Sequence, residues 1–444
     1  MVKRNQRIKK IYFFYCLTRF YLVIIFISIP SQVFAFLDFI KVIGNNSGST
    51  GRGGTAIAIG EPGNMNFNPA IISEIKGNAV EIDFLMATAN FEFKYTGTNN
   101  EREASNMKDR IGILPGMNYV SNNPDSPWSW GLSFTIPDGF FTDYTIQSKN
   151  FGSVNAYSEV LHFRLAQVTA YQITPALTLG LRVGIDYGTL DLRMPLGIAY
   201  LDIGTCDSVG GSCALGLFYK PSEEIAFGVY YETTQLGDLK SRDNDGYIKF
   251  SSPSVNLGKL DVEVDEFQFP DHFGFGFAYK PFKSWRFSAD IKYICWADDW
   301  DELKLNLTGG PANLSTLKIP MDIDNQIPFS FGIEYFPNEI WTFLIGYHYN
   351  DDPMKANYLN PIIAAEEKHL ITCGFSVQPV KQFKFGVSFM YGMMDDPEAS
   401  DIHAYDLSIE RQLGLQRGTL QSELSDSTAN YTCFSIELSF VVFW

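Results

Sequence analysis

From residue 79 onward, apolar and polar residues alternate along many short stretches of the chain. In residues 179–187 every odd position is large and apolar, and every even position is small or charged. The same alternation occurs in residues 273–277, 329–335 and 383–389. Because successive side chains of a strand point to opposite faces of a sheet, each stretch is predicted to be a β-strand with one apolar face.

Fourteen segments are predicted as strands. They are residues 79–95, 109–121, 128–143, 157–174, 176–193, 208–220, 223–237, 263–281, 284–306, 319–337, 340–352, 366–379, 381–394 and 430–444. Very short links that contain proline join some of them, as at 174–175, 220–223, 280–283, 336–339 and 378–381. Longer polar stretches join the others, at 194–207, 238–262, 307–318, 353–365 and 395–429.

Short turns at one end and long loops at the other are typical of outer-membrane β-barrels. Closure of the barrel leaves no unpaired strand edge in lipid. We therefore predict an all-β fold, in which residues 79–444 form a 14-stranded antiparallel transmembrane β-barrel. An even number of strands places both ends of the barrel at the side of the short turns.

The composition favours a barrel over a soluble β-sandwich, the other fold that alternation allows. The chain has 37 Phe and 23 Tyr, which would crowd a core only ~10 Å thick between two sheets. In a barrel these residues face lipid instead. Mean hydropathy near zero excludes a polytopic helical membrane protein. The formal charge of −16 argues against nucleic acid as a partner.

Both ends of the sequence carry targeting features. Residues 1–35 combine a basic start with an apolar stretch at 20–29, which predicts a secretory signal peptide cleaved after Ala35. An uncleaved anchor helix is the alternative, but Arg19 leaves the apolar stretch short for a bilayer. The last strand alternates up to Trp444. That ending resembles the signal read by the bacterial barrel-assembly machinery, and an ordinary buried strand is the alternative.

Cysteine does not organise the predicted fold. The five cysteines after the signal peptide lack the spacing of a zinc site, so we expect no metal and no cofactor. Cys206 and Cys213 flank a loop that contains glycine, and they are candidates for a disulfide in an oxidising compartment. The other three stand singly in apolar stretches.

Residues 36–78 differ from the rest and are predicted to form a separate N-terminal region. Seven glycines lie between positions 44 and 63. The run Gly51-Arg52-Gly53-Gly54-Thr55-Ala56-Ile57-Ala58 is followed by Asn68-Pro69-Ala70. Ile136-Pro137-Asp138-Gly139-Phe140 and Gly346-Tyr347-His348-Tyr349 are two further motifs. Together these motifs resemble the outer-membrane transporter family for long-chain fatty acids and aromatic hydrocarbons.

The resemblance implies a barrel plugged by a small N-terminal hatch, residues 36–78. It implies passive uptake of hydrophobic compounds, with long-chain fatty acids as the first substrate class and aromatic hydrocarbons as the alternative. In the family, extracellular loops capture the ligand and the lumen binds it. Movement of the hatch then releases it sideways through a break in the wall. The expected partners are these ligands, outer-membrane lipid and the barrel-assembly machinery, and the expected state is a monomer.

The matching motifs supply candidate residues for this transport. Gly51, Arg52, Asn68, Pro69 and Ala70 are candidates for positioning or gating the hatch, and folding of the hatch alone is the alternative role. Pro137 and Gly139 are candidates for the wall break, since proline and glycine weaken a strand ladder. Termination of the strand is the alternative there.

The ligand itself could be contacted by two kinds of residue. The apolar residues Phe36, Leu37 and Phe39 are candidates to reach into the ligand site, and a frayed terminus is the alternative. Charged residues predicted to face the lumen are Arg164, Arg182, Asp186, Arg193, Asp290, Lys292, Glu334 and Glu437. Arg164 or Arg182 would suit a fatty carboxylate. A structural network across the lumen is the alternative for these charges.

Other classes of protein fit the sequence less well. An enzyme needs a nucleophile and a base in a defined arrangement, and no such motif surrounds the histidines at 162, 272, 348, 369 and 403. A non-specific porin lacks a hatch. A surface adhesin or structural barrel stays an alternative because of the long acidic loops at 238–262 and 395–429.

Overall fold

The computed structural model describes residues 37–444 except 39, 97–101, 108–110, 197, 244, 252–253, 310–314, 356–357, 360–367, 395–407, 409, 413, 415 and 418–426. The signal peptide, its cleavage after Ala35, and both Phe36 and Phe39 lie outside the described residues. Everything described belongs to one compact unit, Val33–Trp444.

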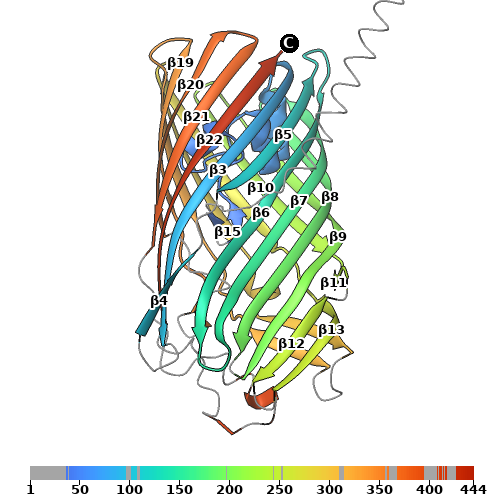
Figure 1. Ribbon diagram of the computed structural model, residues 1–444. Helices are drawn as coiled ribbons and strands as arrows, with labels where there is room; N and C mark the ends of the chain where they lie inside the picture. Colours follow the sequence, from blue (N-terminus) through green and yellow to red (C-terminus); the bar gives the residue numbers. More distant parts are fainter. Residues whose placement is uncertain are drawn as a thin grey trace, which may run out of the picture. The chain divides into compact units, whose positions relative to one another are not determined.

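Fourteen of the described strands form a closed antiparallel ring (Figure 1). In ring order they are β3 (Gly77–Thr96), β5 (Gly112–Asn122), β6 (Trp128–Ser148), β7 (Gly152–Thr174), β8 (Leu177–Leu196), β9 (Ala199–Tyr219), β10 (Ile225–Leu236), β14 (His272–Phe282), β15 (Trp285–Ile294), β18 (Phe329–Tyr335), β19 (Trp341–Tyr349), β20 (His369–Val380), β21 (Phe383–Met393) and β22 (Thr428–Phe443). The ring closes where β22 pairs with β3, from Thr428 opposite Lys94 to Phe443 opposite Ala79. The predicted 14-stranded antiparallel barrel is confirmed.

Beyond the ring, further strands extend the sheet past β9. β11 (Leu239–Ser241) and β12 (Gly246–Ser251) pair with β9 and with β13 (Ser254–Asp265). β13 pairs in turn with β16 (Glu302–Thr308), which pairs with β17 (Thr316–Pro320). Another short strand, β4 (Arg102–Asn106), pairs with the end of β3. Figure 1 shows β11, β12 and β13 at the end away from the C-terminus. The long loops predicted there therefore contain strands of their own.

Several predicted boundaries are wrong in extent. The strand predicted at 284–306 ends at Ile294, where the helix α3 (Trp296–Asp299) begins, and the alternation resumes only in β16. The strand predicted at 263–281 begins in β13, and its ring strand starts at His272. The loop predicted at 194–207 is the tip of the β8–β9 hairpin, since Leu196 pairs with Ala199. Alternation predicts that a segment is a strand, but it does not predict which strand pairs with it.

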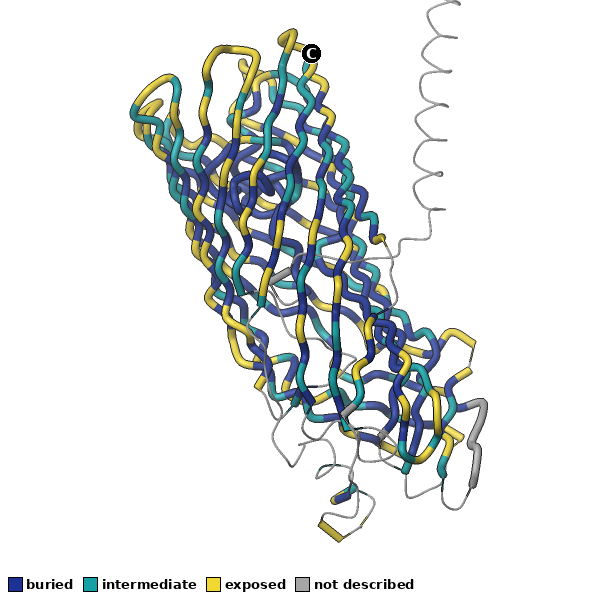
Figure 2. Tube along the Cα trace, turned by 60° about the vertical axis from the view of Figure 1, so that its left-hand side comes forward, coloured by how far each residue is buried: buried dark blue, intermediate teal, exposed yellow. Residues whose placement is uncertain are grey.

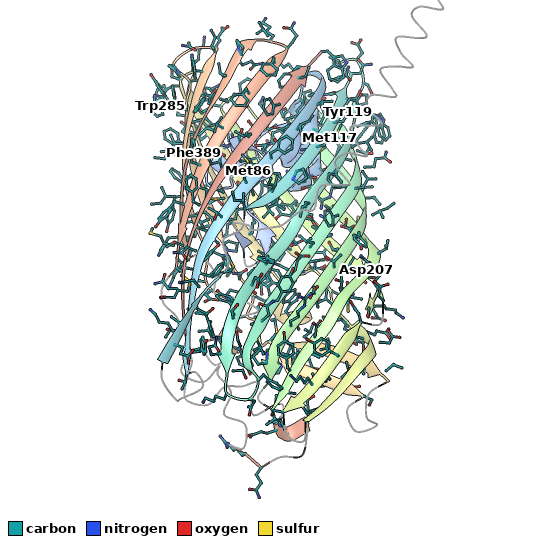
Figure 3. The ribbon with its side chains drawn as sticks, viewed as in Figure 1. Met86, Met117, Tyr119, Asp207, Trp285 and Phe389 are labelled. Carbon is teal, nitrogen blue, oxygen red and sulfur yellow. The ribbon has the colours of Figure 1, made fainter. Side chains whose placement is uncertain are left out.

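The alternation of the sequence separates the outer face of the ring from its interior (Figure 2). On β8, Leu179, Leu181, Val183 and Ile185 are exposed, whereas Arg182 and Asp186 are fully buried. Side chains such as Trp285 cover the outer face (Figure 3). Seven of the eight charges predicted to face the lumen are buried, and Arg193 is the half-exposed exception.

The N-terminal segment, defined here as residues 40–76, lies against the inner face of the ring. It contains β2 (Lys41–Val42), α2 (Ser47–Gly51) and the 3-10 helices η1 (Pro62–Asn66) and η2 (Pro69–Glu74), and the two-residue β1 (Leu37–Asp38) precedes it. A Cβ on Gly180 would stand 2.2 Å from Ala70 N, and a Cβ on Gly216 would stand 2.2 Å from Asn68 Oδ1. The inward glycines of the strands thus leave room for this segment.

The proposed pairing of Cys206 with Cys213 is wrong. Both lie on the single strand β9, with Cys206 opposite Leu190 and Cys213 opposite Val183. Seven residues of strand separate their Cα atoms by ~23 Å, whereas a disulfide needs less than ~7 Å. Both are free thiols.

Candidate functional site

Arg52 joins the N-terminal segment to the barrel wall through buried ion pairs. Its guanidinium lies 2.7 Å from Glu61 Oε2 and 3.3 Å from Glu334 Oε1 of β18. Lys384 of β21 adds a contact of 2.9 Å to Glu61. Burial by itself opposes both charges, but the ion pairs outweigh it, so the pKa of Arg52 is raised and that of Glu61 is lowered. Arg52 therefore stays charged and paired inside the barrel.

The residues around Arg52 fit the wall closely. Asn46 caps α2, since its side chain accepts a hydrogen bond from Ser49 N. Thr372 of β20 donates through Oγ1 to Gly51 O at 3.0 Å and accepts from Gly53 N at 2.9 Å. A Cβ on Gly51 would stand 2.8 Å from Leu344 Cδ1. Gly51 and Arg52 thus form one contact surface with β18 to β21.

The Asn68-Pro69-Ala70 motif begins η2 and anchors it to β9. The Asn68 amide donates to Ile57 O at 2.9 Å and to Leu217 O at 3.1 Å, and its Oδ1 accepts from Ala70 N at 3.1 Å. Pro69 occupies the first position of the helix, where its missing N–H costs nothing. Asn68 therefore ties the motif both to the segment itself and to the wall.

The wall is interrupted beside Pro137 and Gly139. The β5–β6 ladder ends at Met117 opposite Phe134, although β6 continues to Ser148. The β6–β7 ladder shifts its register between Thr135 and Asp138, where Pro137 lacks an N–H to donate. The structure thus brings Pro137 and Gly139 to the place where β6 has lost its β5 partner.

At this interruption β2 pairs with β6. Gly139 N donates to Ile40 O at 2.9 Å, and Lys41 lies opposite Asp138 in register. The Lys41 ammonium is 2.8 Å from Asp138 Oδ1, and both residues are buried. We call this contact between residues 40–41 and 138–139 the clasp.

A chain of buried polar contacts leads from the clasp across the barrel interior. His162 lies between Asp138 and Asp186, at 2.5 and 2.6 Å. Arg164 binds Asp186 at 2.7 Å and Glu232 at 2.5 Å. Arg182 binds Glu232 at 2.5 Å and donates to Asn66 O in the N-terminal segment. Both candidate carboxylate receptors, Arg164 and Arg182, are therefore occupied by protein partners.

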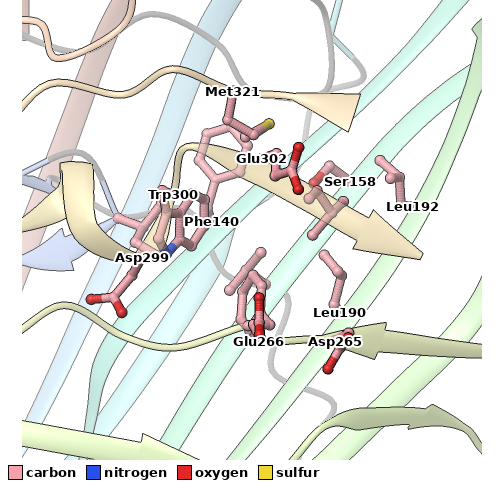
Figure 4. Close-up of a pocket in the computed structure, with 14 residues that line it drawn as sticks. Phe140, Ser158, Leu190, Leu192, Asp265, Glu266, Asp299, Trp300, Glu302 and Met321 are labelled. Carbon is pink, nitrogen blue, oxygen red and sulfur yellow. The ribbon is translucent and has the colours of Figure 1, made fainter. Parts of the chain in front are cut away.

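A narrow apolar cavity lies next to the clasp, because Ile40 lines it. Figure 4 shows Phe140, Leu190, Leu192 and Trp300 around this cavity. The centre of a water molecule can occupy a volume of about 40 Å³ inside this cavity. Apolar side chains that line it include Ile40, Phe140, Leu190, Leu192, Phe267 and Trp300. Four carboxylates also line it, those of Asp265, Glu266, Asp299 and Glu302. We call it the outer cavity.

A second cavity lies across the clasp. Lys41, Val42, Pro137, Arg164, Glu232 and His272 are among its lining residues, and its volume is about 20 Å³ by the same measure. Because Ile40 lines the outer cavity and Lys41 lines this inner cavity, the clasp separates the two.

The site residues predicted from the sequence do not include Ile40, Lys41, Phe140, Leu190 or Leu192. A signal for two of them exists on β8. Its inward positions are Gly180, Arg182, Gly184 and Asp186 in one half, and they become apolar at Leu190, Leu192 and Met194 in the other. A change from charged to apolar residues in the inward phase of one strand would have located the outer cavity.

The sequence matches a family model described as an outer membrane protein transport protein (OMPP1/FadL/TodX) over residues 44–432. The chain belongs to this family. Its members are transport proteins of the outer membrane rather than enzymes.

Solved structures show the same fold. The Pseudomonas putida toluene transporter TodX is 20% identical with a TM-score of 0.73, and the match covers 90% of this chain and 99% of that one. A Pseudomonas aeruginosa FadL homologue is 14% identical with a TM-score of 0.73, covering 91% and 99%. The Ralstonia pickettii toluene transporter TbuX is 17% identical with a TM-score of 0.69, covering 90% and 98%.

Among curated proteins, no relative matches the chain by sequence. In the part of the chain that the structure describes, no helix is long and apolar enough to cross a membrane. Among those same residues, no group of three or more His, Cys, Asp or Glu is arranged to hold a metal ion.

Proposed function

We propose that this protein carries hydrophobic compounds passively across the outer membrane, by way of the outer cavity, the clasp and the interruption of the wall. The observation that carries the proposal is the position of the clasp. It lies between the outer and the inner cavity, on the stretch of β6 that lacks β5, so its release would join the outer cavity to the interruption of the wall. A hydrophobic ligand gains ~0.8 kcal/mol for each buried CH₂ and would leave sideways into lipid without crossing water.

In this proposal the N-terminal segment acts as the hatch of the barrel. The Arg52 ion pairs and the Asn68 hydrogen bonds hold its body on the wall, whereas the clasp holds its first residues through one ion pair and one backbone hydrogen bond. The clasp is the weaker attachment. We therefore assign gating to residues 40–41 and a positioning role to Gly51, Arg52, Asn68, Pro69 and Ala70.

The charges of the outer cavity bear on the substrate class. Asp265 and Glu302 pair with Lys304 and Lys318, whereas Glu266 and Asp299 have no ion pair among the described residues. A ligand carboxylate within ~4 Å of either would be repelled by about 1 to 4 kcal/mol. With Arg164 and Arg182 already paired, this favours uncharged hydrocarbons, and long-chain fatty acids are the second candidate.

Binding and uptake by the purified protein in liposomes test the proposal. We expect toluene to bind and enter, dodecanesulfonate to bind at least tenfold more weakly, and sugars to be excluded. Free entry of sugars would replace the transporter by a porin. Equal binding of toluene and oleate, unchanged in an E266Q/D299N variant, would restore fatty acids as the first substrate class.

A further inference from the structure

A row of buried aromatic rings connects the outer cavity to the clasp. Phe267 lines the cavity, and its ring meets the Phe269 ring edge-on at a centroid distance of 5.7 Å. Phe269 stacks on the His162 imidazole at 4.2 Å, with the two planes inclined by only 9°. His162 is fully buried and Phe269 nearly so. Two aromatic contacts therefore join the cavity wall to His162.

His162 holds the carboxylate that forms the clasp. Its Nδ1 lies 2.5 Å from Asp138 Oδ2, and Lys41 binds the other oxygen of the same carboxylate. Its Nε2 lies 2.6 Å from Asp186 Oδ1. Each ring nitrogen of the imidazole thus contacts one carboxylate, so His162 bridges the clasp and Asp186.

The two sides of this bridge are not equally fixed. Asp186 also binds Arg164, which is held in turn by Glu232 and by Thr234 Oγ1 at 2.8 Å. Within the described part of the chain, the side chain of Asp138 is within ion-pair distance of His162 and Lys41 alone. A shift of the imidazole is therefore taken up on the side of Asp138 and the clasp.

We propose that His162 is a positioning residue that couples a ligand in the outer cavity to release of Lys41 from Asp138. A ligand that enters beside Phe140, Leu190 and Trp300 displaces Phe267 and Phe269, and the stacked His162 ring moves with them. Asp138 then loses its alignment with Lys41, and the clasp opens. This coupling rests on the proposed function, because it explains how the gate senses the ligand.

The first test compares two buried histidines. We expect His162→Gln to leave toluene affinity within about threefold while toluene uptake into liposomes falls at least tenfold, because Gln hydrogen-bonds but does not stack on Phe269. His348, buried on β19 and bonded to Ser330 at 2.8 Å, gives the matched control His348→Gln, which should change neither quantity. Wild-type uptake by His162→Gln would overturn the coupling.

A second test separates coupling from a merely structural role. Lys41→Met removes the clasp ion pair, so the gate no longer needs His162 to open it. The double variant K41M/H162Q should therefore take up toluene as fast as K41M alone. A double variant as slow as H162Q would overturn the proposal.

Hydrogen exchange at Gly139 gives a readout that does not depend on transport. The Gly139 amide is protected by Ile40 O, so toluene should raise its exchange at least fivefold in the wild type and not in H162Q. Equal responses of the two proteins would overturn the coupling. Toluene-dependent exchange without any uptake would instead overturn the proposed transport and leave the coupling in place.

Discussion

The Lys41 ammonium lies 2.8 Å from the Asp138 carboxylate, a buried pair that joins residues 97 positions apart in the chain. It stands where β6 runs on without β5, and the neighbouring Ile40 O accepts the Gly139 N–H. One short strand of the N-terminal segment thereby pairs with β6 where β5 does not.

Locking the clasp should stop transport without unfolding the barrel. Lys41 and Asp138 are register partners, so cysteines at both positions lie within disulfide reach. We expect uptake of toluene by oxidised K41C/D138C to fall at least tenfold and to recover after reduction. The single variants K41C and D138C are the controls and should not respond to reductant. Full uptake by the oxidised double variant would show that the ligand leaves by another route.

Filling the space at Gly180 should push the N-terminal segment from the wall. A Cβ there would come within 2.2 Å of Ala70 N, a backbone atom that cannot turn aside. We expect Gly180→Ala to cost about 1 to 3 kcal/mol of stability, the usual range for overpacking. Heat denaturation followed by gel mobility measures the loss. Gly211→Ala is the control on the next strand, because its Cβ would meet only Gly184 O at 3.4 Å.

Removing Arg52 should destabilise the protein most at neutral pH. The charges around Glu61 lower its pKa below the usual value of 4.5, so the stabilisation is present above that value and is lost as the pH falls below it. We expect Arg52→Met to cost about 3 to 5 kcal/mol at pH 7, as for other broken buried ion pairs. The difference from wild type should shrink at pH 3 in guanidinium unfolding. Lys384→Met, at a partly exposed partner of Glu61, should cost less.

Binding of an anionic ligand should depend on pH through Asp299. Burial first, and then the neighbouring Asp271 and Asp298, raises the pKa of Asp299 to about 6. Asp299 is therefore ionised at pH 7.5 and largely neutral at pH 5. Dodecanesulfonate keeps its own charge throughout, so we expect its affinity to rise several-fold on acidification, as calorimetry would measure. Asp299→Asn should remove the dependence, and Glu339→Gln, at the other end of the barrel, should keep it.

The period of two in the sequence was enough to predict strands, their number and their inward residues. It located Arg182 and Asp186 inside and Leu181 and Val183 outside, because a pleated strand leaves no other arrangement once one face meets lipid. It failed at residues 284–306, where the alternation stops at α3 and resumes in β16, which has left the ring to pair with β13. The alternation within one strand is the same whichever strand pairs with it.

The sequence by itself thus determined the class of fold and, through its motifs, the residues of the N-terminal segment that meet the wall. Tertiary structure decided which charges remain free, because pairing depends on distances between residues far apart in the chain. It showed Arg164 and Arg182 bound to Glu232, His162 held between two carboxylates, and Cys206 apart from Cys213. The outer cavity and the clasp arise only when the strands close and bring Ile40 against Gly139.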